Sequence, residues 1–323
     1  MLSIVLLASV IIAQQPSATT LSNPSINYTR PAKSYVILKR GNIEAVVADN
    51  SAVDDHILPL HRAGYSGVAK LTHKKRNENL FVPGYAGLNF EHILDGTIPA
   101  DRNIQFEPRN HPMQLRVIDK NTVELYQSPT FHHALESCQR YELLPDGTIQ
   151  LTIEVTARKP TFRNGYIGLF WASYIHRPES LDIHFRGESN NWIRGTTPAH
   201  GILSTHRSIS DSRNFTHDEP FPLTLVYSFS SHRFTEPWYF GVNRGLAFVQ
   251  MFRSKDQVRI TQSPSGGGDG NPAWDFQFHV PNLELNHIYQ FVMRAAYLPY
   301  TSPEQIEKAT RKHRAALNRA GGK

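Results

Sequence analysis

Hydrophobic and polar residues alternate with a period of two along much of the chain, which is the pattern of half-buried β-strands. The pattern is clearest in Thr148–Ala157, where aliphatic residues alternate with glutamine, threonine and glutamate. Strand after strand of this kind indicates a sheet packed on a sheet. The expected strands are Tyr35–Ala48 (two strands joined by a Gly-Asn turn), Gln114–Ile118, Thr122–Gln127, Ser137–Leu144, Thr148–Ala157, Leu223–Phe229, Leu246–Phe252, Gln257–Gln262, Trp274–Val280 and Ile288–Tyr297.

The end of the chain carries the one strong helix signature. Ser302 is the expected N-cap, Pro303 the first helical residue, and Gln305 completes a capping box in front of a helix that runs to about Ala320. No repeat of fixed period is visible. The sequence therefore predicts an all-β fold, a large antiparallel sandwich over residues 33–300, followed by one C-terminal helix and a basic tail over residues 301–323.

The stretch Asn164–Pro178 is expected to be the central strand. Both of its alternating faces are mostly apolar, which predicts a strand covered on both sides. It ends in polar residues, Tyr174, His176 and Arg177, before Pro178. Such a strand could hold reactive groups rigidly at its rim. The alternative is that His176 only caps the strand and bonds a backbone carbonyl.

A long polar region from residue 49 to about residue 112 has little periodicity and is expected to be rich in loops. Its centre, Glu78–Asp95, mixes aromatic residues with Asn89, Glu91 and His92, and Arg62 precedes it. Sugar sites need flat apolar surfaces beside fixed hydrogen-bonding groups, and this composition supplies both. A loop packed by its own aromatic side chains is the competing interpretation.

Composition adds limits to this picture. The 323 residues are 40% hydrophobic and 19% charged, as in an ordinary globular protein. The formal net charge of +6 would suit an anionic partner, although basic faces are more often simply solvated. No basic-aromatic signature of RNA or DNA recognition is present, so no nucleic-acid partner is expected.

The N-terminus has the pattern of an export signal. Leu2–Ala13 is an apolar run too short to span a bilayer and of the length of a signal-peptide core. We expect residues 1–18 to be a signal peptide, cleaved after Ala13 or near Ala18, and residues 19–32 to be a polar leader. No later segment is apolar enough to cross a membrane, and Cys138 is the sole cysteine. A secreted or periplasmic protein without intrachain disulfides is therefore expected.

Residues 122–157, which contain the hairpin sequence YELLPDGTIQLTI, resemble the middle of galactose mutarotase-like and aldose-1-epimerase domains. The resemblance implies a β-supersandwich over most of the chain and an active-site histidine at the end of the following strand, here Gly165–His176. Where aldose epimerases carry an N-H-x-Y-F-N-L motif, this chain has S-Y-I-H-R-P at residues 173–178. The same superfamily includes domains of glycoside hydrolases, polysaccharide lyases and sugar-binding proteins.

Two further stretches carry candidate chemistry. Thr235–Val242 places Glu236 beside Trp238, and a glycine-rich loop around Asp269 leads to Trp274. A carboxyl group beside aromatic platforms is suited to acid–base work on a sugar, and a plain surface turn explains the same residues. His56 and His61, with Asp54 and Asp55 nearby, could form a metal site, but they lack the spacing of a known metal motif, so we expect no metal and no cofactor.

We therefore expect a carbohydrate-directed acid–base enzyme, an epimerase, mutarotase or lyase, in which a histidine works with a carboxylate. The alternative is a catalytically silent sugar-binding or structural module on the same fold. The partner is expected to be a mono- or polysaccharide. The catalytic candidates are His176, Glu236 and His92, and the substrate-binding candidates are Arg62, Asn89, Glu91, Tyr174, Arg177, Trp238, Asp269 and Trp274.

Overall fold

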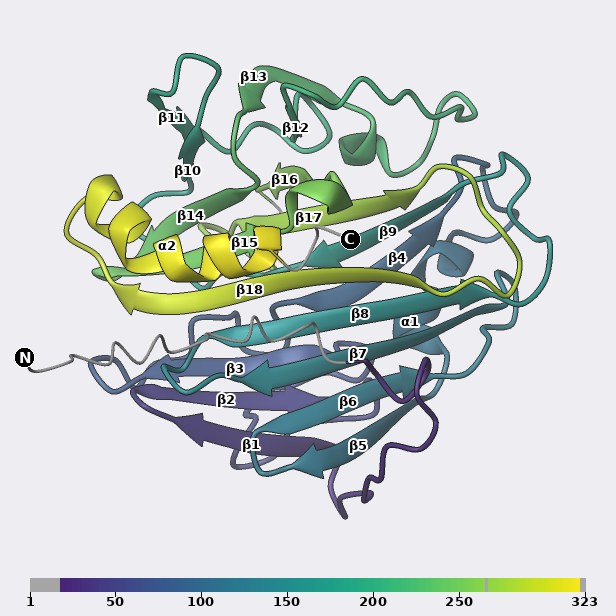
Figure 1. Ribbon diagram of the computed structural model, residues 1–323, viewed down its shortest axis with the longest axis horizontal. Coiled ribbons are helices and arrows are strands. Elements are labelled where there is room, and N and C mark those ends of the chain that lie inside the picture. Colours follow the sequence, from purple (N-terminus) through teal and green to yellow (C-terminus); the bar gives the residue numbers. More distant parts are fainter. Residues whose placement is uncertain (1–17, 265–266, 320–323) are drawn as a thin grey trace, which may run out of the picture.

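The computed structural model describes residues 18–264 and 267–319 and shows a β-sandwich (Figure 1). A nine-stranded sheet has the order β11 (Trp192–Gly195), β10 (Ile183–Arg186), β14 (Trp238–Asn243), β15 (Leu246–Phe252), β18 (Tyr289–Pro299), β8 (Ile149–Ala157), β7 (Leu135–Leu143), β6 (Thr122–Gln127) and β5 (Met113–Asp119). A six-stranded sheet has the order β13 (Phe229–Phe234), β12 (Thr205–Ser208), β16 (Arg259–Ser263), β17 (Ala273–Val280), β9 (Ile167–Ala172) and β4 (Asn89–Leu94).

A three-stranded sheet of β1 (Tyr35–Arg40), β2 (Ile43–Ala48) and β3 (Gly67–His73) completes the structure. The neighbouring strands pair antiparallel except β12 and β13, which pair in parallel. The predicted all-β antiparallel sandwich is thus confirmed. Short helical turns are η1 (Arg102–Phe106), α1 (Glu107–Asn110), η2 (Thr224–Val226) and η3 (Ser254–Asp256).

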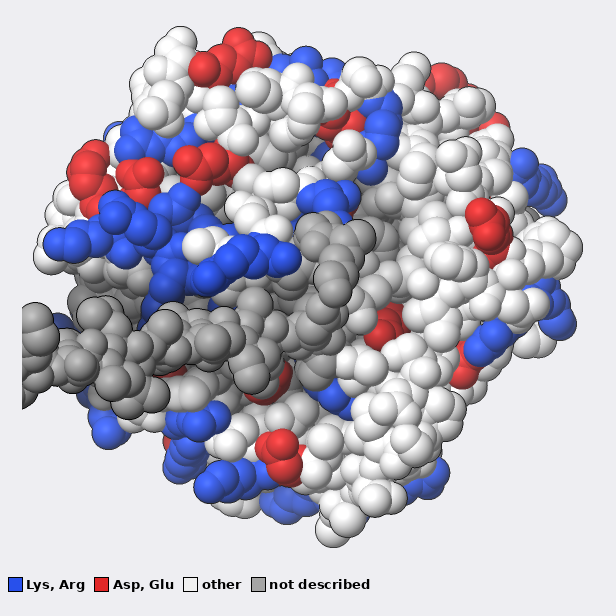
Figure 2. Space-filling view, in the orientation of Figure 1, with Lys and Arg blue, Asp and Glu red and all other residues white. Residues whose placement is uncertain are grey.

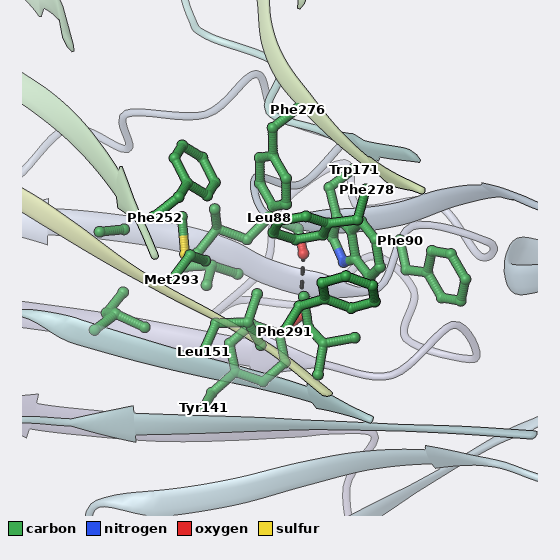
Figure 3. Packing of buried hydrophobic residues seen from close by; sticks show 14 of the residues in the cluster. Leu88, Phe90, Tyr141, Leu151, Trp171, Phe252, Phe276, Phe278, Phe291 and Met293 are labelled. Atoms are coloured by element: carbon green, nitrogen blue, oxygen red, sulfur yellow. Dashed lines mark hydrogen bonds between the residues drawn. The ribbon is translucent and has the colours of Figure 1, made fainter. Parts of the chain in front are cut away.

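The core lies between the sheets and is built around Trp171 of β9 (Figure 3). Its indole ring stacks on Phe90 of β4 with 4.5 Å between ring centroids and lies parallel to Phe276 of β17 at 5.5 Å. The indole nitrogen donates a hydrogen bond to Gln139, 3.0 Å away, so the polar edge of the buried ring is satisfied. The expected central strand is therefore covered on both faces, with Phe170 and Ala172 facing away from this core.

Helix α2 (Pro303–Arg319) packs on the outside of the nine-stranded sheet, against β15 and β18 (Figure 1). Ile306 and Leu317 of the helix are buried with Trp238 and Phe240 of β14. Ser302 accepts a hydrogen bond from the backbone nitrogen of Gln305 at 3.2 Å, as expected of the N-cap. No helix in the described ranges is both long and apolar enough to cross a membrane.

Two expectations about local structure are wrong. The region from residue 49 to 112 contains strands β3 and β4, which the sequence hides because their polar residues lie on buried faces rather than in solvent. Leu223–Phe229 is not a strand but contains the turn η2, and its apolar residues are buried because the segment lies on the six-stranded sheet.

The first described residues also dock on the sandwich, although they were expected to be a polar leader. Thr19 donates a hydrogen bond to Glu154 at 2.7 Å, and the backbone nitrogen of Thr20 donates to Glu124 at 3.0 Å. Both glutamates are buried in the nine-stranded sheet. The expected signal peptide lies almost wholly outside the described residues.

Candidate functional site

A β-bulge in β4 turns a carboxylate onto the outer face of the six-stranded sheet, which we call the site face. Phe90 pairs with Trp171 and His92 with Phe170, so Glu91 is the extra residue between them. Phe90 faces the core, and Glu91 faces away from it. Bulges commonly re-aim a side chain in this way beside functional sites.

Glu91 is the centre of a polar group that we call the Glu91 cluster, formed with His92, Arg109 and Tyr174. The Tyr174 hydroxyl lies 2.9 and 2.8 Å from the two carboxylate oxygens and donates its hydrogen to them. Nη2 of Arg109 donates to Oε1 of Glu91 at 2.7 Å and to the Tyr174 hydroxyl oxygen at 2.7 Å. Nε2 of His92 lies 3.3 Å from the same carboxylate. Three segments, β4, α1 and the extension that follows β9, therefore meet at one carboxylate.

Aromatic rings surround the cluster. Tyr65 and Tyr85 lie edge to face at 4.6 Å, and Tyr85 lies 4.9 Å from the ring of Tyr174. The guanidinium of Arg109 lies over Tyr65 at 4.3 Å and over Phe106 at 5.0 Å. Tyr65, Tyr85 and Phe106 are only half-buried, whereas Glu91 and Tyr174 are buried beneath them. The arrangement is a polar floor with an aromatic rim.

The electrostatics of the cluster separate its groups into charged and neutral ones. Burial of Glu91 favours the neutral acid, but the charges of Arg109 and His92 and the hydrogen bond from Tyr174 outweigh it and lower the Glu91 pKa to about 2. Burial, followed by the charge of Glu91, raises the pKa of Tyr174 well above 10. At neutral pH Glu91 is therefore a carboxylate and Tyr174 a phenol that can donate a proton.

A second carboxyl group, Asp275 of β17, lies on the same face. The backbone nitrogen of Ser173 donates to its Oδ1 at 2.9 Å. Burial, and then the charge of Glu91, raise the pKa of Asp275 well above 3.8. Asp275 was not among the predicted site residues, although the alternation in β17 places it opposite the apolar residues Trp274 and Phe276. That alternation is the signal that could have found it.

Other site residues gave no such signal. Arg109 lies in the four-residue helix α1, and Tyr65 lies before β3. Their positions in the chain do not indicate that they meet Glu91, because the contact depends on how α1 packs beside β4.

The structure brings several predicted residues together. Glu91, His92 and Tyr174 form the cluster, and Arg62 lies at its rim, with its guanidinium 5.4 Å from the centre of the Tyr85 ring. Asn89 is buried beside them and accepts a hydrogen bond from the Ser66 nitrogen at 3.2 Å. The glycine-rich loop carrying Asp269 also reaches this rim, where a Cβ added to Gly267 would lie only 2.6 Å from the Tyr85 ring. Asp269 itself is exposed.

His176 and Arg177 lie just beyond Tyr174, at the predicted strand end. The backbone of His176 is held by Leu80 and Asn243, each at 2.9 Å, and the Arg177 nitrogen donates to Asn271 at 2.9 Å. Burial, and then the charge of Arg177, lower the pKa of His176. Within the described ranges, no ion pair joins the His176 ring to a carboxylate, and its Nδ1 has no hydrogen-bond partner.

The predicted convergence of Glu236 with this site is wrong, because Glu236 lies on the other side of the sandwich. Its carboxylate bonds the indole nitrogen of Trp238 at 2.9 Å and pairs with Arg314 of α2, outside the nine-stranded sheet. Trp238 is buried under α2, and Trp274 is buried in the core between the sheets. Neither tryptophan can serve as a stacking surface for a sugar in this conformation. In residues 18–264 and 267–319, no group of three or more ligating side chains could hold a metal ion.

Comparisons with known proteins found no matching sequence family and several solved structures of low identity. No protein-family model matches the sequence, and no curated protein does. A proposed aldose 1-epimerase from Escherichia coli K12 is 12% identical over 85% of this chain and 100% of that one, with a TM-score of 0.47. A galactose mutarotase related enzyme from Lactobacillus acidophilus is 8% identical over 83% of this chain and 98% of that one, with a TM-score of 0.46.

A heparan sulfate lyase from Pedobacter heparinus is 10% identical over 86% of this chain and 37% of the lyase, with a TM-score of 0.39. The similar solved structures thus include one described as a proposed aldose 1-epimerase and one described as a galactose mutarotase related enzyme, both at 12% identity or less. With TM-scores below 0.5, the likeness is one of general architecture.

Proposed function

We propose that this protein is a carbohydrate-active enzyme that works by acid–base chemistry at the Glu91 cluster. The observation that carries the proposal is the meeting of a buried carboxylate, a phenol and a guanidinium beneath half-exposed aromatic rings. Sugars present hydroxyl groups at their edges and flat C–H surfaces on their faces. A rim of Tyr65 and Tyr85 would stack on a ring face, while Arg62 and Arg109 would bind oxygens.

The pKa pattern supports proton transfer rather than binding alone. Pairs of titratable groups whose surroundings push their pKa values apart are the usual sign of an acid and a base. Here Glu91 is charged, with a pKa of about 2, while burial raises the pKa values of Asp275 and Tyr174. In a mutarotation, an epimerisation or a β-elimination, a base removes one proton from the sugar and an acid returns one to an oxygen. We assign Glu91 as the acceptor and Tyr174 as the donor, with His92 and Arg109 orienting the carboxylate.

A binding module without catalysis is the second candidate, and one observation favours it. Both oxygens of Glu91 are already engaged, and a carboxylate with a pKa of about 2 is a weak base. In that case the cluster would be a rigid floor for recognition only.

One variant separates the two candidates. Purified protein is incubated with a panel of mono- and polysaccharides, and products are followed by proton NMR and by the absorbance of unsaturated sugars. If the enzyme assignment is right, Glu91→Gln lowers turnover by roughly 10²–10⁴-fold, the usual contribution of one acid–base group. Glu236→Gln, on the other side of the sandwich, is the matched control and keeps activity. Wild-type protein that binds a sugar without turning it over identifies the binding module.

We also propose that the protein is exported and that cleavage leaves Thr19 in the mature chain. The support is that Thr19 and Thr20 bond buried glutamates, so their removal would leave Glu154 and Glu124 short of partners. Mass spectrometry of protein from the periplasm or medium should show a chain that begins between residues 14 and 19. An intact N-terminus on active protein in the cytoplasm would contradict export.

A further inference from the structure

A cavity of about 230 Å³ opens where β4 ends. We call it the β4-end cavity. Its walls come from the end of β4, the loop that leads into η1, and the loops before β7 and β9. The volume is below the roughly 300–1,000 Å³ of sites that enclose drug-sized ligands, so it suits one ring of a longer molecule. The lining residues used below are Asp95, Gln105, His132, His133, Phe162 and Arg163.

The β4-end cavity shares a wall with the Glu91 cluster. Phe106 packs on His92 with 4.4 Å between ring centroids, and Arg109 lies over Phe106. Gln105, the residue before Phe106, lines the cavity instead. Asp95 directly follows β4 and lies four residues after Glu91, which is about 13 Å of extended chain at about 3.3 Å per residue. A short oligosaccharide spans such a distance, whereas a single sugar does not.

The cavity contains a hydrogen-bond donor that nothing in the described structure uses. Gln105 is only 3% exposed, and its amide nitrogen has no hydrogen-bond partner among the residues described. A buried donor of this kind is costly unless a ligand or water meets it. Asp95, which also lines the cavity, accepts from Thr97 and from the backbone nitrogen of Arg163 at 2.6 Å, and in the described structure it accepts nothing from the Gln105 amide.

The surroundings of the cavity suit a sugar ring. The rings of Phe162 and His133 lie in its wall, tilted by 48° to each other with 5.3 Å between their centroids. Next to the lining residue His132, the Phe131 ring is 83% exposed and contacts the His132 ring at 4.8 Å. An aromatic ring with an accessible face can stack on the C–H face of a sugar. Arg163 and His132 add hydrogen-bond donors for hydroxyl or carboxylate oxygens.

We propose that the β4-end cavity is a second saccharide subsite, so that the substrate is an oligosaccharide or polysaccharide rather than a free monosaccharide. This inference rests on the proposed carbohydrate function of the Glu91 cluster. Gln105 donates to an oxygen of a sugar unit that lies beyond the reacting one, and Phe131 stacks on the chain where it leaves the cavity.

The test measures polysaccharide binding separately from turnover. Wild-type protein is run in native gels that contain polygalacturonate, chondroitin sulfate or the neutral glucan laminarin. We expect at least one polymer to retard it. Gln105→Leu and Phe131→Ala should each weaken that retardation at least tenfold in apparent dissociation constant, while thermal melting shows that the variants are folded. Ile202→Ala, which alters an apolar side chain of similar exposure outside the cavity, is the control and should bind as the wild type does.

Each result decides the inference. Retardation of Gln105→Leu and Phe131→Ala equal to that of the wild type overturns the subsite, and so does the absence of retardation by every polymer. Glu91→Gln distinguishes the two proposals, because it should lose turnover and still be retarded. If Glu91→Gln is retarded and also turns over substrate normally, the assignment of Glu91 fails while the subsite stands.

Discussion

The two outer faces of the sandwich obey the same strand alternation but carry different chemistry. The face of the nine-stranded sheet under α2, which we call the helix face, is apolar: Trp238, Val249, Met251 and Ala296 pack against Ile306 and Leu317. The site face is as deeply buried but polar. It carries the nearly inaccessible side chains Glu91, Asp275, Gln277, His279 and Arg259.

On the site face, this difference leaves some buried polar atoms without hydrogen-bond partners. Both ring nitrogens of His279, and single atoms of Gln277 and Arg259, have no hydrogen-bond partner in residues 18–264 and 267–319. Phe215 stacks on His279 at 4.5 Å, so aromatic residues of the covering segment lie against polar ones. Natural proteins depart from apolar burial in this way chiefly at functional sites. The comparison therefore supports the proposal that the function lies on the site face, while the apolar packing of the helix face contributes to stability.

Charge is also placed differently on the two faces. In Figure 2 a group of lysines and arginines lies over α2 on the helix face, with others scattered elsewhere in the view, and water screens such surface charges. On the site face, the charges of Arg109 and Glu91 are buried and meet each other at 2.7 Å. Removing an exposed charge on α2 should therefore cost little stability, whereas removing one partner of the buried Arg109–Glu91 pair should cost much more.

The largest loss of stability is expected from a substitution in the core between the two sheets. Trp171→Ala should lower the free energy of unfolding by about 3–5 kcal/mol, because a fully buried aromatic side chain leaves a cavity. Urea denaturation monitored by circular dichroism measures the change. A loss below about 1 kcal/mol would mean that the two sheets do not depend on one packed core.

The ion pairs of the two faces give the next and sharpest contrast. Arg109→Met strands the buried Glu91 carboxylate and should cost about 3–5 kcal/mol. Arg314→Met breaks the pair with Glu236, whose side chain is 42% exposed, and should cost about 0–1 kcal/mol. Both are measured by denaturation at low salt. Equal losses for the two variants would remove the distinction between the faces.

The pH dependence of stability should also be traceable to the site face. Glu91 titrates at 4.5 when unfolded and at about 2 when folded, so its stabilisation is present above pH 4.5 and is lost as the pH falls toward 2. Asp275 has the opposite sign: its pKa is raised on folding, so it lowers stability as the pH rises above 3.8. We expect Glu91→Gln to flatten the acid side of the stability profile, measured by urea midpoints between pH 2 and pH 6. An unchanged acid slope would mean that other carboxylates set it.

How far the sequence anticipates the site depends on which contacts are local. Alternation predicts β8, β15 and β17, and the capping residues predict α2, because these signals lie within single segments. Alternation does not predict β4, because a bulge shifts the register at Glu91 and polar residues occupy a buried face. Composition drew attention to Glu91, His92 and Tyr174. The meeting of Arg109 with them is set by tertiary packing, and that is also why Glu236, beside suitable aromatic residues in sequence, lies on the wrong face.

His176→Ala is expected to have the smallest effect, and it tests the boundary of the site. The sequence alone predicts a loss of activity of roughly 10²–10⁴-fold, as for an acid–base residue. In the structure, backbone bonds to Leu80 and Asn243 hold the segment whatever the side chain is, and the ring forms no ion pair with a carboxylate in the ranges described. We therefore expect the variant to fold with a change of less than about 1 kcal/mol, as for most substitutions away from special features. We also expect it to keep activity within about tenfold, less than one acid–base group contributes. Side-by-side kinetics of His176→Ala and Glu91→Gln on the same saccharide provide the measurement. If His176→Ala remains folded and loses as much turnover as Glu91→Gln, the reacting atoms lie nearer the end of the β9 extension than to the bulge. The active site is then centred on His176 and not on Glu91.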